Sequence, residues 1–94
     1  MDTKHTPGPW FTTGTRGTRY VEARIGFVLQ EVAACGPTEK AGQQEANARL
    51  IAAAPLLLDA LRDCVALIER DMPGDRAAQP ELIAARAAIA AATN

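Results

Sequence analysis

Aromatic side chains are scarce in this 94-residue sequence, which contains one Trp, one Tyr and two Phe residues. Apolar residues make up 48% of the chain, but many of them are alanines. Each buried position therefore removes little area from water, at about 25 cal/mol per Å². A chain this short also leaves a large share of its surface exposed when it folds. We expect a thin core. We also expect association into a homodimer or higher homo-oligomer, which buries additional apolar surface.

Histidine and cysteine are equally scarce, since His5 is the only histidine and Cys35 and Cys64 are the only thiols. A closed zinc site would need ligands from distant points of the chain. A nucleophile with a histidine base would require something to fix His5, which lies on an N-terminal arm. Cys64 falls on the apolar side of a predicted helix and is interpreted as a small buried hydrophobe. We expect no enzyme activity, no metal and no cofactor.

The sequence has neither a strong net charge nor a long apolar run. Its net charge is −1, with only a modest basic excess in residues 1–30. General binding to nucleic acid needs a basic stripe, so none is expected, although a small arginine-lined anion pocket is compatible with the sequence. Charges interrupt every apolar run before the ~18 residues of a membrane span. The first residues also lack the apolar region of a secretory signal, so we expect a cytosolic protein without a membrane partner.

What the N-terminal third contains is a proline-rich arm followed by strand-like segments. The arm is HTPGPW at residues 5–10, and tight Gly-containing turns separate the segments that follow. Such close spacing predicts an antiparallel meander, in which Val21 and Ala23 share one face of the second strand and Tyr20 and Arg24 share the other. The predicted strands are residues 10–13, 19–24 and 27–34.

Helical spacing of apolar residues takes over after a polar linker. A long helix is predicted over residues 41–71 and a second helix over residues 80–92. The pattern continues in phase across Pro55, so we expect one kinked, near-continuous helix. The alternative is a second helix that begins with Pro55 in its first turn, where proline is tolerated.

The fold class predicted from these segments is α+β. A small three-stranded antiparallel sheet within residues 1–36 is followed by the two helices, in a single domain over residues 1–94. The apolar stripe of the long helix is wide, because neighbouring rows begin at Asn47 and at Ala46. One small sheet cannot cover both rows, so part of the stripe is expected to pack on the last helix or on a second subunit.

Asn47 is a polar side chain on this apolar stripe. A buried amide that lacks partners for its donors and acceptor costs about 1–3 kcal/mol. It either bonds to backbone of the sheet or the arm, or it faces a cavity between sheet and helix and contacts a ligand. Arginines 16, 19, 24, 49 and 62 are potential anion donors, each also explained as a solvated surface residue.

Trp10 is interpreted either as a plug that seals the sheet against the helices or, with Tyr20, as apolar or stacking surface for a ligand. The ligand-binding residues predicted from all of these features are Asn47, Arg49, Arg24, Trp10, Tyr20 and Arg62.

Two motifs together, HTPGPW at residues 5–10 and EANARLIAAAP at residues 45–55, resemble a widespread set of small bacteriophage and prophage proteins. The resemblance covers about residues 5–70. More loosely, the small sheet followed by a helix that opens with Ala46-Asn47-Ala48 is similar to phage anti-Thoeris sponge proteins. Those proteins hold cyclic ADP-ribose signals between sheet and helices, so this resemblance implies Asn47 and nearby arginines as ligand contacts and helices as the means of assembly.

The leading hypothesis is therefore a phage counter-defence protein in the host bacterial cytoplasm. It would sequester a cyclic nucleotide immune signal, of the cyclic ADP-ribose type, without turning it over. The alternative is a phage protein that inhibits a host defence protein, such as a CRISPR effector, through its surface. A structural or regulatory accessory protein without a ligand is a third reading.

Overall fold

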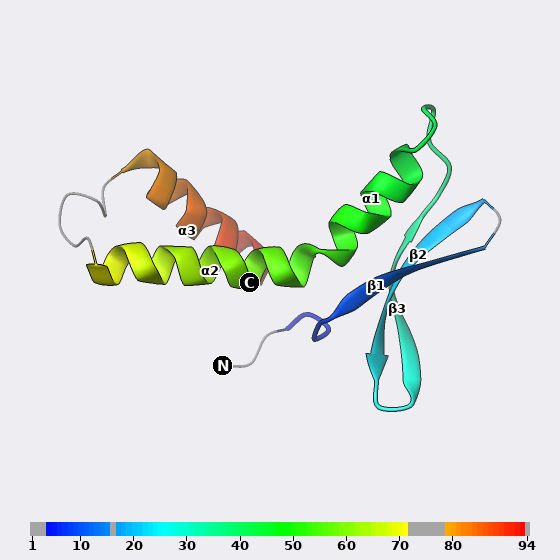
Figure 1. The fold of residues 1–94 in the computed structure, drawn as a ribbon, viewed down its shortest axis with the longest axis horizontal. Helices are drawn as coiled ribbons and strands as arrows, with labels where there is room; N and C mark the ends of the chain where they lie inside the picture. The colour runs from blue at the N-terminus through cyan, green and yellow to red at the C-terminus, as the bar shows by residue number, and fades with distance from the viewer. Residues whose placement is uncertain (1–3, 16, 72–78, 94) are drawn as a thin grey trace. The chain divides into compact units, whose positions relative to one another are not determined.

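The residues that the structure describes form three strands and three helices, in the order β1-β2-β3-α1-α2-α3. The structure is a computed structural model and describes residues 4–15, 17–71 and 79–93. Arg16 and the predicted helix end at 72–74 lie outside the described residues. The predicted α+β class, with an antiparallel sheet that precedes the helices, is confirmed (Figure 1).

The sheet is an antiparallel meander of β1 (Trp10–Thr15), β2 (Thr18–Ile25) and β3 (Val28–Cys35). Its strands extend the predicted ones by one or two residues at most ends. Gly26 has a φ of 61° and takes the first position of the two-residue turn between β2 and β3. Glycine in that position, followed by a residue without positive φ, fits a type II′ hairpin turn. Phe27 was predicted to begin the third strand, but it occupies the second position of this turn.

The alternation predicted for β2 is confirmed, because Val21 and Ala23 are fully buried. Trp10 lies opposite Ala23 in the register and therefore shares their face of the sheet. The opposite face carries Tyr20 and Arg24. A bulge in β3 opposite the Val21–Glu22 step shifts the register of β2 and β3.

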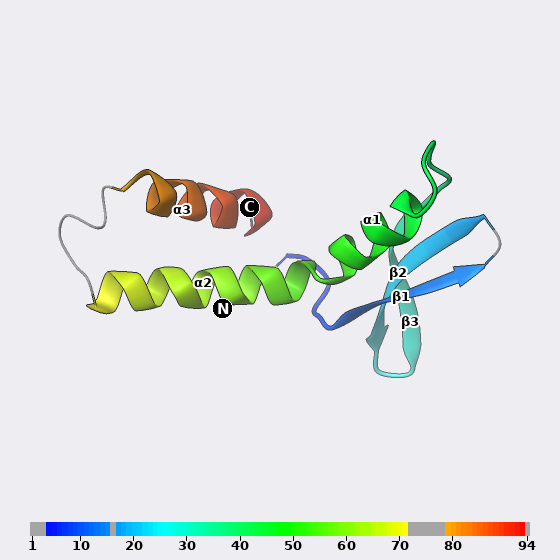
Figure 2. The same cartoon turned by 45° about the horizontal axis from the view of Figure 1, so that its top comes forward.

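The helix α1 (Gln43–Ala52) packs against all three strands and covers one face of the sheet (Figures 1 and 2). Ala48 is its buried residue, with 1% of its surface exposed. Because Ala48, Val21 and Ala23 are small, the helix backbone can approach the sheet closely. These three residues form the core of this part of the chain.

The long helix predicted over residues 41–71 is divided at Ala53. Ala53 closes α1 with a hydrogen bond from its N–H to the carbonyl of Arg49, at 3.0 Å. The next helix, α2 (Ala54–Asp71), has Pro55 as its second residue. An N–H at that position has no partner inside a helix, so proline fits there without loss. The structure thus has the alternative arrangement, with a second helix that carries Pro55 in its first turn.

The last helix, α3 (Pro80–Thr93), matches the prediction to within one residue. The chain divides into two compact units. We call Thr6–Leu56 the sheet unit. We call Leu57–Asn94 with Met1–His5 the hairpin unit, after the helical hairpin formed by α2 and α3. In the hairpin unit α2 and α3 lie side by side (Figures 1 and 2). Val65 of α2 and Leu82 of α3 are its buried residues in the part of the chain that the structure describes.

Candidate binding surfaces

The two sequence motifs meet in the sheet unit. A Cβ added to Gly8 of HTPGPW would lie 2.9 Å from the Cβ of Pro55, the last residue of EANARLIAAAP. The indole Nε1 of Trp10 donates to the carbonyl of Thr6 at 3.0 Å, and the Gln30 amide donates to the Thr6 hydroxyl at 3.1 Å. The arm is therefore fastened to the sheet by Trp10 and Gln30, and it packs against the start of α2 at Gly8. These contacts favour the structural interpretation of Trp10.

A small polar cleft lies where α1 crosses the first hairpin. Arg19 lies across Gly14, since a Cβ added there would be 2.7 Å from the Arg19 Cδ, and its guanidinium pairs with Glu45. Arg49 approaches the same carboxylate at 3.9 Å. The cleft has a volume of about 70 Å³ and is lined by these charged residues with Thr12 and Ala48. Two arginines share one glutamate here, which leaves one positive charge in excess.

Asn47 does not lie on the buried side of α1. Its side chain is exposed, whereas the next residue, Ala48, is buried against the sheet. Successive helical residues are turned by about 100° from each other, so the face that meets the sheet passes through Gln44 and Ala48. The prediction of a buried Asn47 amide is therefore wrong.

The amide that ties α1 to the sheet belongs to Gln44. Its Nε2 donates to the carbonyl of Cys35 at 2.7 Å and to the carbonyl of Gly17 at 2.9 Å. Sequence reasoning missed this residue because Gln44 lies before the apolar stripe that was used to set the helical phase. The sequence signal that could have identified Gln44 is its position one helical turn before Ala48, on the same face of the helix.

The remaining predicted ligand-binding residues are not gathered in one cavity of the sheet unit. Arg49 borders the polar cleft on the α1 side of the sheet. Tyr20 and Arg24 lie on the opposite face, because they alternate with the buried Val21 and Ala23. Arg62 is half-buried and belongs to the hairpin unit.

The β2–β3 hairpin tip is an apolar surface that the sequence analysis missed. We define the tip as Ile25, Gly26, Phe27, Val28 and Leu29. Phe27 is fully exposed at 104%, and Val28 is 65% exposed. Ile25 and Leu29 are exposed as well. The run of apolar residues was visible in the sequence, but the assignment of Phe27 to a strand concealed its position in a turn.

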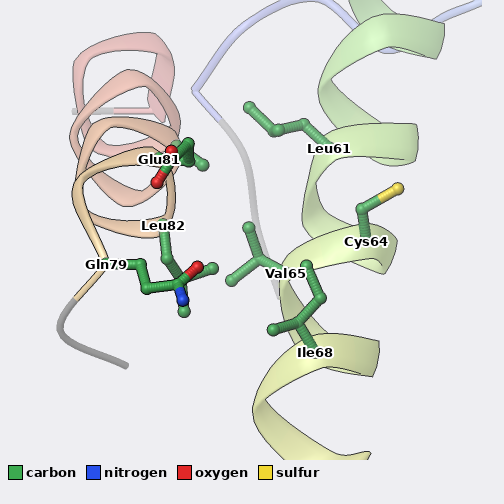
Figure 3. Close-up of a pocket in the computed structure, with 8 residues that line it drawn as sticks. Leu61, Cys64, Val65, Ile68, Gln79, Glu81 and Leu82 are labelled. Carbon is green, nitrogen blue, oxygen red and sulfur yellow. The ribbon is translucent and has the colours of Figure 1, made fainter. Parts of the chain in front are cut away.

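The hairpin unit contains an apolar groove between α2 and α3, with a volume of about 180 Å³. Figure 3 shows Val65 and Leu82 pointing toward each other, while the sulfur of Cys64 points away from α3. Leu61 and Ile68 complete the α2 side of the groove. Cys64 is a free, exposed cysteine, so its interpretation as a buried hydrophobe is wrong. The reason is that α3 covers only part of the apolar surface of α2.

The residues that the structure describes contain neither a metal-binding cluster nor a membrane-spanning helix. No three or more His, Cys, Asp and Glu residues of residues 4–15, 17–71 and 79–93 are grouped so as to hold a metal ion. Within those same residues, no helix is long and apolar enough to cross a membrane.

Comparison with protein families shows which family the chain belongs to. The model of the family described as Salmonella phage P22 protein Y8K6 matches residues 1–94. The chain belongs to this family. The predicted membership in a group of small phage proteins is thereby confirmed, while the similarity to anti-Thoeris sponge proteins stays a prediction. Comparisons with curated proteins and with solved structures give no match.

For this member of the P22 Y8K6 family, the described surfaces are of two kinds. The tip and the α2–α3 groove are apolar, whereas the Arg19–Glu45–Arg49 cleft is polar and small. Apolar surface of this kind is typical of protein–protein contacts, and paired arginines are typical of anion contacts.

Proposed function

We propose that this phage-family chain is a binding protein that attaches to a host protein through the β2–β3 tip. The supporting observation is Phe27, a fully exposed aromatic ring at the end of a hairpin in a chain with four aromatic residues. Burial of such a side chain contributes about 1.5–3 kcal/mol. Aromatic anchors that enter a pocket of a partner commonly supply much of the binding energy at an interface.

The flanking charges favour a protein pocket over a lipid surface as the receptor for the tip. Arg24 precedes the tip and Glu31 follows it, and both are exposed. Their charges cancel, whereas segments that attach to anionic membranes carry clusters of Lys and Arg. The type II′ turn also fixes the backbone that carries Phe27, so little conformational entropy is lost when the ring is bound.

The host protein in this proposal is a defence protein that the phage must disable, and the place of action is the host bacterial cytoplasm. Membership in a phage family supports this choice. The chain would act by occupying a surface of its target and would carry out no reaction.

Photocrosslinking in host cells tests the proposal. A photoreactive amino acid replaces Phe27 in one variant and Glu39, an exposed residue of the same unit, in a control variant. We expect position 27 to crosslink to one host protein of fixed mass and position 39 not to do so. Equal crosslinking at both positions, or crosslinking of position 27 to lipid alone, would contradict the proposal.

Sequestration of a cyclic nucleotide signal is the second candidate function. The observation in its favour is the polar cleft, where Arg19 and Arg49 share Glu45 and a phosphate could take the place of the carboxylate. The cleft volume of about 70 Å³ is far below the ~300–1,000 Å³ of ordinary ligand sites. A nucleotide would therefore need further surface, supplied by a second copy of the chain.

Native mass spectrometry with a panel of cyclic ADP-ribose isomers and cyclic oligonucleotides tests this second candidate. We expect one member to be retained at fixed stoichiometry and released unaltered on denaturation. The Arg49→Ala variant should lose roughly tenfold or more in affinity, because a charge-assisted hydrogen bond is removed. Retention of no member of the panel by the wild-type chain would eliminate this candidate.

A further inference from the structure

The apolar surface of α2 extends well beyond the part that α3 covers. We define the open face of α2 as Leu57, Ala60, Cys64, Leu67 and Ile68. Leu57 is 54% exposed, Leu67 is 49% exposed and Ile68 is 37% exposed. Cys64 and Ile68 also line the α2–α3 groove, so the groove and the open face form one continuous apolar surface of the hairpin unit.

The spacing along the open face is that of a coiled-coil seam. Residues 57, 60, 64 and 67 follow each other at intervals of three, four and three residues. This is the a and d pattern of a heptad repeat, in which side chains of one helix fit between those of a second helix. A face with this pattern is complementary to a copy of itself.

The hairpin unit has a small core. Among its described residues only Val65 and Leu82 are buried. Near or below about 40 residues, a unit with so small a core usually requires a disulfide, a metal or oligomerisation. Cys64 is free, and the described residues contain no group able to hold a metal. Association with a second copy would bury more apolar area.

The composition of α3 supports the same conclusion. After Arg86, which donates to Glu69 of α2, the helix continues to Thr93 without a charged residue. The positions after Arg86 are mostly exposed alanines. Before Arg86, Ile83 is 54% exposed. Alanine permits a second helix to approach closely, and a solvated helix face would ordinarily carry charge.

We infer that the open face of α2 and the adjoining groove bind a second copy of the hairpin unit. The product is a four-helix bundle with two-fold symmetry, in which α2 of one copy packs against α2 of the other near Cys64.

Crosslinking through Cys64 tests this arrangement in the full chain. In a Cys35→Ser background, a short bis-maleimide should join two copies through their exposed Cys64 thiols. The control moves the thiol to the opposite side of α2, with Ala66→Cys in a chain that also carries Cys64→Ser. We expect the Cys64 protein to give a covalent dimer on a denaturing gel and the Ala66→Cys protein to give no crosslinked product under the same conditions.

Sedimentation velocity gives an independent measurement. The wild-type chain should sediment as a dimer, and Leu67→Gln should raise its dissociation constant by about 30-fold or more. Ala66→Gln introduces the same side chain one residue away, on the side of α2 opposite Cys64, and should leave the dissociation constant unchanged. Circular dichroism verifies that both variants keep their helices.

Two results would overturn the inference. One is a wild-type chain that remains a monomer at ~100 µM, a concentration at which even a weak specific dimer with a micromolar dissociation constant forms. The other is a dimer that crosslinks as well through Ala66→Cys as through Cys64, since the interface would then lie elsewhere on the chain.

Discussion

At the scale of single residues, the position of an amide on α1 decides its role. Asn47 and Gln44 lie on the same helix, yet Asn47 is exposed while Gln44 donates to two carbonyls of the sheet unit. The sequence could not distinguish them, because a stripe of alanines leaves the helical phase uncertain by one residue. In β2 the period-two alternation predicted a shared face for Val21 and Ala23, and both residues are buried there.

Gly8 illustrates a steric requirement at the residue scale. Because an added Cβ would lie 2.9 Å from the Pro55 Cβ, Gly8→Ala must displace the arm or the start of α2. We expect a loss of about 1–3 kcal/mol in the free energy of unfolding, measured by urea denaturation. Gly36→Ala is the matched control, since nothing lies within 4 Å of its added Cβ and its φ is not positive. It should change the free energy of unfolding by less than ~0.5 kcal/mol; equal effects of the two substitutions would contradict the proposed Gly8–Pro55 packing.

At the scale of elements, tight turns and alternation predicted the meander, and helical periodicity predicted the helices. The division at Ala53 was only an alternative, because the apolar pattern continues in phase through Pro55. The break lies beside a tertiary contact, the approach of Gly8 to Pro55, that no local pattern encodes. The tip was missed for a related reason, since a one-residue change in turn position moves Phe27 from a ladder to full exposure.

The attachment of α1 to the sheet yields a prediction at this scale. Gln44→Ala removes the donor to the carbonyls of Cys35 and Gly17. Because its side chain is partly buried there, we expect the free energy of unfolding to fall by about 1–2 kcal/mol. Asn47→Ala is the matched control on the same helix, and it should be neutral or slightly stabilising, as alanine is the better helix former. Thermal or urea denaturation of both variants checks the pair, and a larger loss from Asn47→Ala would show that the helical phase described for α1 is wrong.

At the scale of the whole molecule, the chain combines surfaces of different kinds on two compact units. The hairpin unit supplies the face proposed for self-association, and the sheet unit supplies the tip proposed for a host protein. A dimer would then carry two tips, which increases avidity for a target that is itself multivalent. The thin core and the excess of apolar helix surface were predictable from composition. The partner was not, because its identity depends on the shape of a pocket in another molecule.

Isothermal titration of the protein that crosslinks at position 27 is the most direct test of the proposed binding function. The purified protein is titrated with the wild-type chain, with Phe27→Ser and with the control Glu39→Ser. We expect Phe27→Ser to weaken binding by about 30-fold or more while its melting temperature stays that of the wild type, because Phe27 is fully exposed. Glu39→Ser should bind as the wild type does. Undiminished affinity of Phe27→Ser for this protein would contradict binding through the tip.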